Sequence, residues 1–415
     1  MAAAAGGTGR LNHEARGISA LDILYVGTLP PHSGGSAVVG YQLLAGLARM
    51  GHRVRAIAPI TPETIDAGDG FSRRHPEICL TRFLVPFFNS SPDRIQPQSY
   101  LEAEDRAVRG AFHDAVRDRR PDLLIIGRES FAQSLPELAS TAGIRSMLLV
   151  HGSGLFGMVH WFAPRHRDHL VEQFRRVDRV VAVARHLIDG PLRELGLRDV
   201  AFVPNPVDLR RFAPAPKSSE LMARLGIRDD HFVIAHLSNM KPIKRASDII
   251  RCAPEVIARV PNARYVIVGD GISRDDLEAE VRARGISDHF RFVGWVDHES
   301  VPDYINLSDA VVMPSQSEAA ALVYLETMAC ARLLIASDIP GAREIIRDGK
   351  TGLLFRMGDN DDLTAKLVLA AVDPGLRQRI GRAACDAAKA HDVESFVADY
   401  ERMICSLVEH RRADR

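Results

Sequence analysis

Two glutamates, Glu318 and Glu326, are separated by seven residues and follow a short apolar run. The run Ala310–Met313 predicts a buried strand, and the polar residues after it predict a loop that opens a helix at about Ala321. Two such residues on one helix would be rotated by roughly 80° from each other, so both carboxylates can face one crevice only if Glu318 precedes the helix. Carboxylates accept hydrogen bonds from sugar hydroxyls, and the helix N-terminus between them attracts a diphosphate. Taken alone, the spacing is common by chance and favours the simpler interpretation, two solvated glutamates.

A basic loop after the predicted strand 232–237 is a second candidate. It contains Asn239, Lys241, Lys244 and Arg245. Three cations and an amide side chain at the carboxyl end of a strand would neutralise a diphosphate, which a solvated helix face does not require. A basic loop exposed to solvent is the alternative, and we place the diphosphate site ahead of it.

The first half of the chain offers a glycine-rich loop, Gly34-Gly35-Ser36, between a predicted strand at 21–27 and a predicted helix at 36–50. Its glycines let backbone amides approach a phosphate, and Ser36 can cap the helix. A purely structural turn is the alternative. The loop spells neither Gly-x-Gly-x-x-Gly nor a Walker A motif, which weakens a dinucleotide or ATP interpretation.

His151 ends the predicted strand 147–151 and is the first-half candidate for proton chemistry. Histidine has an ordinary pKa near neutrality, so its side chain could donate to a hydroxyl or to a leaving group. A structural histidine is the alternative. The position at a strand end favours function without deciding the question.

Short apolar strands alternate with amphipathic helices along the chain, which predicts an α/β fold with parallel, doubly wound sheets. The alternation breaks at the proline-rich segment 203–216 and then restarts, and 415 residues with 46% hydrophobic content can build two cores. Ligands bind beyond the carboxyl ends of parallel strands, so a crevice between the two halves is the expected site. The remaining predicted strands are 53–58, 123–127, 179–183, 264–269, 290–294 and 333–336.

Composition limits the partners. Lys and Arg total 53, as do Asp and Glu, so no global field argues for nucleic acid or an anionic membrane. The five cysteines include no Cys-x-x-Cys, which fits a reducing compartment and argues against a zinc site. No apolar run approaches the length of a membrane span, so we expect a cytoplasmic protein without an integral membrane segment. The aromatic and basic segment 160–169 leaves peripheral membrane contact open, although a solvated helix is preferred.

Together these motifs resemble those of the GT-B glycosyltransferases, specifically the retaining family 4, over nearly the whole chain after the first residues. The strongest match is 318–329, and segments 268–271, 292–296, 337–346 and 348–355 also resemble the family in order. Within the family, segments 34–40 and 236–239 with Lys244 and Arg245 are most similar to the bacillithiol-pathway N-acetylglucosaminyl malate synthases. The mycothiol-pathway N-acetylglucosaminyl inositol-phosphate synthases follow.

The resemblance implies a nucleotide-sugar donor, with UDP-N-acetylglucosamine as first choice, and a small polar or anionic acceptor. It implies two Rossmann-like domains facing a central cleft: 1–19 a disordered tail, 20–205 the acceptor domain, 206–390 the nucleotide-sugar domain, and 391–415 a helix crossing back to the first domain. No cofactor and no metal are implied, and Asp359 with its neighbours is expected to form a turn and a helix cap. Oligomeric state stays open, with a dimer among the alternatives.

Residue by residue, the resemblance gives Glu326 the ribose hydroxyls and Glu318 a hydroxyl of the sugar. Lys244, aided by Asn239, Lys241 or Arg245, would stabilise the leaving diphosphate. The remaining expected contacts are the amides of Ala320, Ala321 and Leu322 with the diphosphate or sugar, Gly34, Gly35 and Ser36 with the diphosphate, Gly294 and Val296 with the base, and His151 with the sugar near the reacting carbon.

The segment Ala319–Ala321 departs from the family, which commonly has Phe and Gly at its last two positions. Losing Gly restricts the backbone next to the sugar, and losing Phe opens space there. The identity of the sugar therefore stays open. Two alternatives remain: a glycosyltransferase of polysaccharide or glycolipid assembly at the membrane surface, and a non-catalytic nucleotide-sugar-binding protein.

Overall fold

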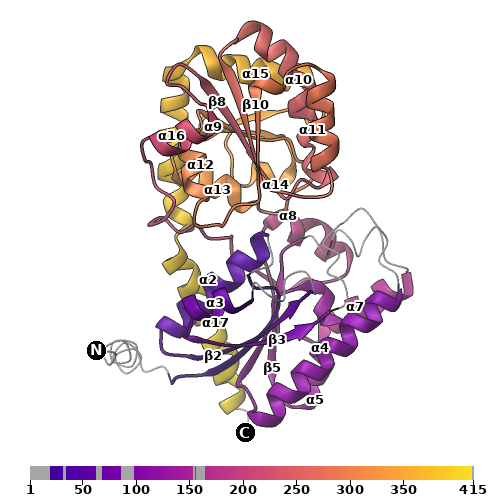
Figure 1. Ribbon diagram of the computed structural model, residues 1–415. Coiled ribbons are helices and arrows are strands. Elements are labelled where there is room, and N and C mark those ends of the chain that lie inside the picture. Colours follow the sequence, from indigo (N-terminus) through magenta and orange to yellow (C-terminus); the bar gives the residue numbers. More distant parts are fainter. Residues whose placement is uncertain are drawn as a thin grey trace. The chain divides into compact units, whose positions relative to one another are not determined.

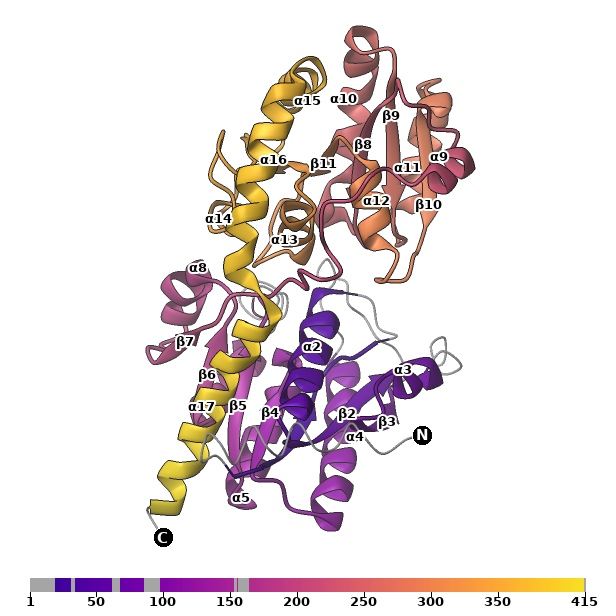
Figure 2. The same cartoon turned by 90° about the vertical axis from the view of Figure 1, so that its left-hand side faces the viewer.

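The computed structural model describes residues 19–30, 34–61, 68–85, 98–152, 155 and 164–413. The chain forms two compact units, one of residues 1–205 with 393–415 and one of residues 206–392. Each unit is built on a parallel sheet with helices on both faces (Figures 1 and 2). This confirms the predicted pair of doubly wound α/β sheets. Of the features expected from the sequence, the tail up to residue 18, residues 153–154 and residues 156–163 lie outside the described residues.

In the described part of the first unit, a seven-stranded sheet has the order β3-β2-β1-β4-β5-β6-β7, and every neighbouring pair is parallel. The strand order reverses between β1 and β4, the kind of position where open α/β sheets bind ligands. The strands are β1 (Asp22–Val26), β2 (Arg53–Ile60), β3 (Ile78–Leu84), β4 (Leu123–Ile126), β5 (Arg145–Val150), β6 (Arg179–Ala182) and β7 (Val200–Phe202).

The helices of this unit come from the first half of the chain and from its C-terminal end. They are α2 (Gly35–Arg49), α3 (Gly68–Arg74), α4 (Gln98–Asp118), α5 (Leu135–Thr141), α7 (Pro164–Arg176), α8 (Arg185–Leu187) and α17 (Val393–Ala413), with short turns at η2 (Glu129–Gln133) and η3 (Ile188–Leu192). The C-terminal helix α17 packs against α2. Gly46 permits this close approach, because a Cβ at that position would lie 2.3 Å from a methyl group of Val397.

In the second unit, a six-stranded parallel sheet has the order β10-β9-β8-β11-β12-β13 among the described residues, with the reversal between β8 and β11. The strands are β8 (Phe232–Leu237), β9 (Ala263–Val268), β10 (Phe290–Gly294), β11 (Ala310–Met313), β12 (Leu333–Ser337) and β13 (Leu353–Phe355). The helices are α9 (Ser219–Leu225), α10 (Ala246–Arg259), α11 (Arg274–Ala283), α12 (Val301–Leu307), α13 (Leu322–Ala329), α14 (Pro340–Arg343), α15 (Asn360–Val372) and α16 (Pro374–Ala388), with turns at η4 (Pro242–Lys244), η5 (Ser287–His289) and η6 (Lys389–His391).

Two apolar cores sandwich this second sheet. Alternate residues of β8 face opposite sides: Phe232 and Ile234 join the core under α10, α11 and α15, whereas Val233 and Ala235 join the core under α9, α12 and α13. The period of two residues follows from strand geometry. Burial on both faces fixes the register of β8 and so the position where its carboxyl end opens into a loop.

Among the described residues of both units, no helix is both long and apolar enough to cross a membrane.

Candidate functional site

Lys244 and Glu318 meet at the reversal point of the second sheet. Lys244 follows β8 and Glu318 follows β11, and these two strands are parallel neighbours. Lys244 Nζ donates to Glu318 Oε1 at 2.6 Å, and Ser315 Oγ donates to the same oxygen at 2.6 Å. The two charged side chains are only 19% and 10% exposed. The site therefore contains a largely buried ion pair where open α/β sheets bind ligands.

The loops that carry this pair are tied to each other and to α14. The Gln316 amide donates to the Ile243 carbonyl at 2.8 Å, which joins the loop after β11 to the loop after β8. On the other side, a Cβ at Gly341 would lie 2.1 Å from the Glu318 carbonyl oxygen. Only a residue without a side chain lets α14 approach the Glu318 loop this closely, so Gly341 helps to set its path.

Helix α13 begins directly after this loop. Its N-cap is Ala321, which has no side chain able to cap, and Leu322 is its first residue. The first amides of a helix have no partner inside the helix, and they carry the positive end of its dipole. Ala320 and Ala321 are half-buried beside this end, and Leu322 is buried. The structure thus confirms that Glu318 precedes the helix and that Glu326 lies inside it.

Glu326 is buried in the second turn of α13, with 6% of its surface exposed. His298 Nε2 donates to Glu326 Oε1 at 2.7 Å, and the imidazole ring lies 5.4 Å from the ring centroid of Phe212. His298 Nδ1 is buried and has no hydrogen-bond partner among the described residues. His298 was not predicted from the sequence. The sequence signal that could have identified it is its position in the loop after β10, close to the expected base contacts Gly294 and Val296.

The other residues of the basic loop differ in their surroundings. Arg245 adopts a left-handed conformation (φ 51°) and forms two hydrogen bonds with Asp248, at 2.8 and 3.1 Å. Lys241 and Asn239 are half-buried, and Asn239 Oδ1 has no hydrogen-bond partner among the described residues. The structure therefore places Lys244 against Glu318, whereas the Arg245 guanidinium forms an ion pair with Asp248.

The expected base contacts, Gly294 and Val296, lie at the end of β10 and just after it. Gly294 has φ 85°, and its carbonyl accepts from the Gly269 amide at 2.8 Å. Val296 is half-buried and packs against the core under α12 and α13, the helix that also carries Glu326.

The first-unit candidates occupy the expected strand ends. Gly34 is the N-cap of α2 and makes no side-chain cap, whereas Ser36 lies inside the first turn with its Oγ 3.2 Å from Thr28 Oγ1. The prediction that Ser36 caps the helix is wrong, because the helix starts one residue earlier than expected.

The His151 turn rests on a carboxylate that the sequence analysis missed. The amides of His151 and Gly152 both donate to Glu129 Oε1 at 2.8 Å, and Glu129 is 2% exposed. Burial lowers the pKa of the His151 imidazole, and the Glu129 carboxylate opposes this by raising it. His151 Nε2 is buried without a hydrogen-bond partner among the described residues. The acidic residue after strand 123–127 was the only sequence signal for Glu129.

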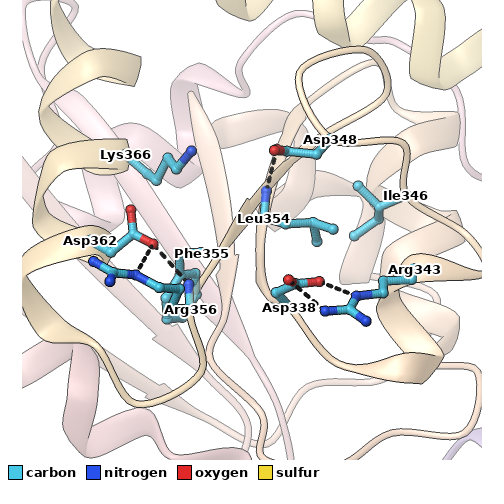
Figure 3. A pocket seen from close by; sticks show the side chains of 9 residues that line it. All are labelled: Asp338, Arg343, Ile346, Asp348, Leu354, Phe355, Arg356, Asp362 and Lys366. Carbon is cyan, nitrogen blue, oxygen red and sulfur yellow. Dashed lines mark hydrogen bonds and ion pairs between the residues drawn. The ribbon is translucent and has the colours of Figure 1, made fainter.

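A cavity of about 510 Å³ lies elsewhere in the second unit, beside the edge strand β13 (Figure 3). Its carboxylates are already engaged: Asp338 pairs with Arg343, Asp362 with Arg356, and Asp348 accepts from the Leu354 amide. It contains none of the residues predicted for the site. It is lined by Asp338, Arg343, Ile346, Asp348, Leu354, Phe355, Arg356, Asp362 and Lys366.

The acidic residues at the start of α15 form a helix cap. Asp359 caps α15 by accepting from the Asp362 amide at 2.9 Å, as predicted. Within the described ranges, no three His, Cys, Asp or Glu side chains gather in a way that could hold a metal ion.

Two family models match consecutive parts of the chain. The model described as Glycosyltransferase Family 4 matches residues 33–211, and the model described as Glycosyl transferases group 1 matches residues 217–386. The chain belongs to glycosyltransferase family 4. The second match contains Lys244, Glu318 and Glu326, and the first contains the glycine-rich loop and His151.

Individual relatives agree with this family. The chain is 25% identical over 380 residues to the N-acetyl-alpha-D-glucosaminyl L-malate synthase of Bacillus anthracis, covering 90% of this chain and 94% of that protein. It is 34% identical over 197 residues to a D-inositol 3-phosphate glycosyltransferase of Kribbella flavida, covering 45% of this chain. The match spans about half the length of that relative, 46%. Both subgroups named from the sequence thus occur among the relatives.

Among solved structures, the Anabaena protein Alr3699/HepE in complex with UDP and glucose is similar in fold. Its TM-score is 0.77 at 18% identity, over 93% of this chain and 100% of that chain. At this identity the likeness concerns the fold, and it agrees with the GT-B class predicted from the sequence.

Proposed function

We propose that this family 4 protein is a retaining glycosyltransferase that moves a sugar from a nucleotide-sugar donor to a small polar or anionic acceptor. The observation that carries the proposal is the Lys244–Glu318 pair beside the start of α13. A cation, a carboxylate and the start of a helix at the carboxyl ends of two neighbouring strands suit a ligand that has both a diphosphate and hydroxyl groups. UDP-N-acetylglucosamine is the first candidate donor.

Each side chain has a role in this proposal. Lys244 and the first amides of α13 stabilise the charge on the leaving diphosphate, and Glu318 accepts from a sugar hydroxyl. Glu326 accepts from the ribose hydroxyls through the oxygen that His298 does not occupy. Preorganised charges of this kind stabilise a leaving group without a further nucleophile. The roles of Gly34, Gly35, Ser36 and His151, which belong to the other unit, remain predictions.

The proposed reaction breaks the bond between the sugar C1 and the diphosphate oxygen. The acceptor oxygen forms a bond to C1 on the face that the diphosphate leaves, so the configuration at C1 is retained. The proton of the acceptor hydroxyl passes to the departing phosphate oxygen. We propose that the positive groups around the diphosphate make a metal unnecessary, which predicts full activity in a chelator such as EDTA.

The names of the relatives support the choice of donor and acceptor. The Bacillus anthracis relative is named as a synthase of an N-acetylglucosaminyl malate, and the Kribbella flavida relative as an inositol phosphate glycosyltransferase. Both names combine a sugar with a small anionic acceptor, and the Anabaena structure contains UDP. These likenesses make UDP-sugars and small anions the first compounds to test.

A ligand screen tests the proposal directly. Thermal unfolding would be measured with UDP, GDP and ADP and with their sugars, since a ligand of the folded state raises the midpoint as its saturation rises. We expect a UDP-sugar to give the largest shift, and NMR of the product to show retained configuration at C1.

Other outcomes separate the alternatives. Binding with neither transfer nor slow donor hydrolysis would leave a nucleotide-sugar-binding protein. Transfer only to lipid-linked acceptors would favour assembly at a membrane surface. No stabilisation by any nucleotide or nucleotide sugar would refute the proposal.

A further inference from the structure

His236 is a fully buried histidine at the carboxyl end of β8, with 0% of its surface exposed. Its Nδ1 lies 2.8 Å from the Val312 carbonyl oxygen of β11, and its Nε2 lies 2.8 Å from Ser238 Oγ. Both ring nitrogens are therefore bonded, which a buried imidazole needs because an unpaired polar group in the core is costly. The side chain therefore links β11 to the loop that follows β8 at the reversal point.

The direction of each hydrogen bond follows from its partners. The Val312 carbonyl can only accept, so Nδ1 carries the proton, and Nε2 of the neutral ring is an acceptor. Ser238 Oγ then donates to Nε2 and accepts from the Met240 amide at 3.1 Å. The network therefore has one arrangement of protons, running from Met240 through Ser238 and His236 to Val312.

The network ends at a strained residue. Met240 has φ 41°, a left-handed conformation that is unusual for a residue with a long side chain. The Ser273 amide donates to the Met240 carbonyl at 3.1 Å. A Cβ at Gly271 would lie 1.9 Å from the Asn239 carbonyl oxygen, so the chain is also held from that side. A conformation of this kind persists where its surroundings hold it from several sides.

The turn at residues 238–240 leads directly to Lys244. The Lys244 amide donates to the Lys241 carbonyl at 2.8 Å, and the Ile243 carbonyl accepts from Gln316 in the Glu318 loop. A change in the path at Met240 therefore displaces Lys244 and its contact with Glu318 together.

We propose that His236 and Ser238 are positioning residues of the active site, which set the turn that carries Lys244 to the diphosphate. The inference rests on the proposed function, because it gives Lys244 its role. Neither residue touches the donor in this proposal. They act through the backbone of residues 238–244, and their loss moves the Lys244 ammonium group without removing it.

The test compares two ligands that differ in the group that Lys244 meets. Ser238→Ala removes the hydroxyl that joins His236 to Met240. We expect its affinity for UDP to fall roughly tenfold, the effect of one such hydrogen bond. Its affinity for uridine, measured by competition with UDP, should stay unchanged. Turnover of the UDP-sugar should fall by a similar factor. Ser238→Thr restores a hydroxyl and should recover most of both losses.

Three further variants accompany this measurement. Lys244→Ala should show the same selective loss for UDP over uridine, only larger. Ser247→Ala, at a half-buried serine of α10, should leave the affinity ratio of UDP to uridine unchanged. His236→Gln keeps a neutral polar side chain and should reproduce the Ser238→Ala ratio, which provides a second route if Ser238→Ala folds poorly.

The proton arrangement has its own signature. In protein labelled with 15N-histidine, one imidazole should be a neutral ring protonated at Nδ1 at pH 7, and its signal should vanish in His236→Gln. Equal losses for UDP and uridine, no loss in Ser238→Ala, or protonation of that ring at Nε2 would overturn the inference. If Lys244→Ala also leaves UDP binding and turnover unchanged, the proposed function fails as well, which distinguishes the two failures.

Discussion

Lys244 Nζ lies 2.6 Å from Glu318 Oε1 in a largely buried setting, so the cation proposed to meet the diphosphate already has a counterion. A buried charge without a partner is strongly unfavourable. The pair thus holds the Lys244 side chain in place before the donor arrives. A bound diphosphate would then share this ammonium group with Glu318.

Replacing Lys244 should affect turnover more than folding. Lys244→Ala removes one preorganised positive group from the leaving diphosphate, and we expect kcat to fall roughly 100-fold. Lys389→Ala is the matched control, because Lys389 also pairs with a carboxylate, that of Asp386, but is exposed. Initial rates with saturating UDP-sugar measure the effect. Equal rates for Lys244→Ala and the wild type would remove Lys244 from the site.

Glu326→Gln should weaken nucleotide binding. The amide keeps the size of the side chain and can still accept from His298, but it loses the charge that strengthens hydrogen bonds to the ribose. We expect the Kd for UDP to rise roughly 10- to 100-fold, the range for a hydrogen bond to a charged group. Isothermal titration calorimetry measures this change, with Glu299→Gln, at an exposed position of the loop after β10, as the control.

His298→Ala tests whether the orientation of the Glu326 carboxylate matters for nucleotide binding, apart from its charge. The substitution leaves Glu326 charged but removes the 2.7 Å hydrogen bond that fixes one of its oxygens. The Kd for UDP should then rise by a smaller factor, roughly 3- to 10-fold. If His298→Ala binds UDP as tightly as the wild type, the orientation of Glu326 does not depend on His298.

The sequence predicted the central strands well, but of the edge strands in the described residues it predicted only β10. Strands β3, β7 and β13 were not predicted, and each lies at an edge of its sheet. Thr81 and Arg82 interrupt the apolar residues of β3, so it lacks the continuous apolar run of a strand buried on both faces. β7 and β13 are apolar but only three residues long, which is too short for the pattern to indicate a strand.

The candidate site could be predicted as motifs but not as contacts. The order of loop and helix placed Glu318 before α13 and Glu326 inside it, because local patterns determine where a helix begins. The motifs placed Lys244 near the glutamates but did not predict its ion pair with Glu318, which forms because β8 and β11 are neighbours at the reversal point. His298 and Glu129 were missed for the same reason, since each meets its partner across a distance in sequence that no local pattern records.

Gly341→Ala tests whether α14 sets the path of the Glu318 loop. The new methyl group would lie 2.1 Å from the Glu318 carbonyl oxygen and 2.8 Å from that of Ala319, so the loop must move. We expect a loss of roughly 1–3 kcal/mol in the free energy of unfolding, the range for overpacking, together with reduced turnover.

Gly110→Ala is the matched control for this substitution. Gly110 lies in α4, and a Cβ there meets no atom within 4 Å. Alanine favours a helix over glycine, so this variant should gain up to about 1 kcal/mol. Urea unfolding and initial rates would be measured for both variants. If Gly341→Ala keeps wild-type turnover, the close approach of α14 does not set the path of the Glu318 loop.

The stability of the second unit should depend on pH through His236. The pKa of its imidazole is lowered from 6.5 to about 4, chiefly by burial and to a smaller extent by the Lys244 charge, while the Val312 carbonyl and Glu318 act in the opposite direction. Between pH 6.5 and pH 4 the unfolded chain binds a proton at this residue and the folded chain does not, so stability falls as the pH falls through this window. Above pH 6.5 both states are neutral there, and below pH 4 both are protonated, so this contribution is constant outside the window.

The loss from His236 should reach about 3 kcal/mol in the free energy of unfolding by pH 4. His236→Gln cannot bind this proton. The difference in free energy of unfolding between the variant and the wild type should therefore change by about 3 kcal/mol between pH 7 and pH 4, in favour of the variant at pH 4. His151 and His231 also have pKa values lowered by burial, and their contributions cancel in the comparison because both proteins retain them. Urea unfolding of the two proteins at both pH values measures the shift. A difference between wild type and variant that is the same at pH 7 and pH 4 would show that His236 is protonated alike in the folded and unfolded chains, and would contradict the lowering of its pKa by burial.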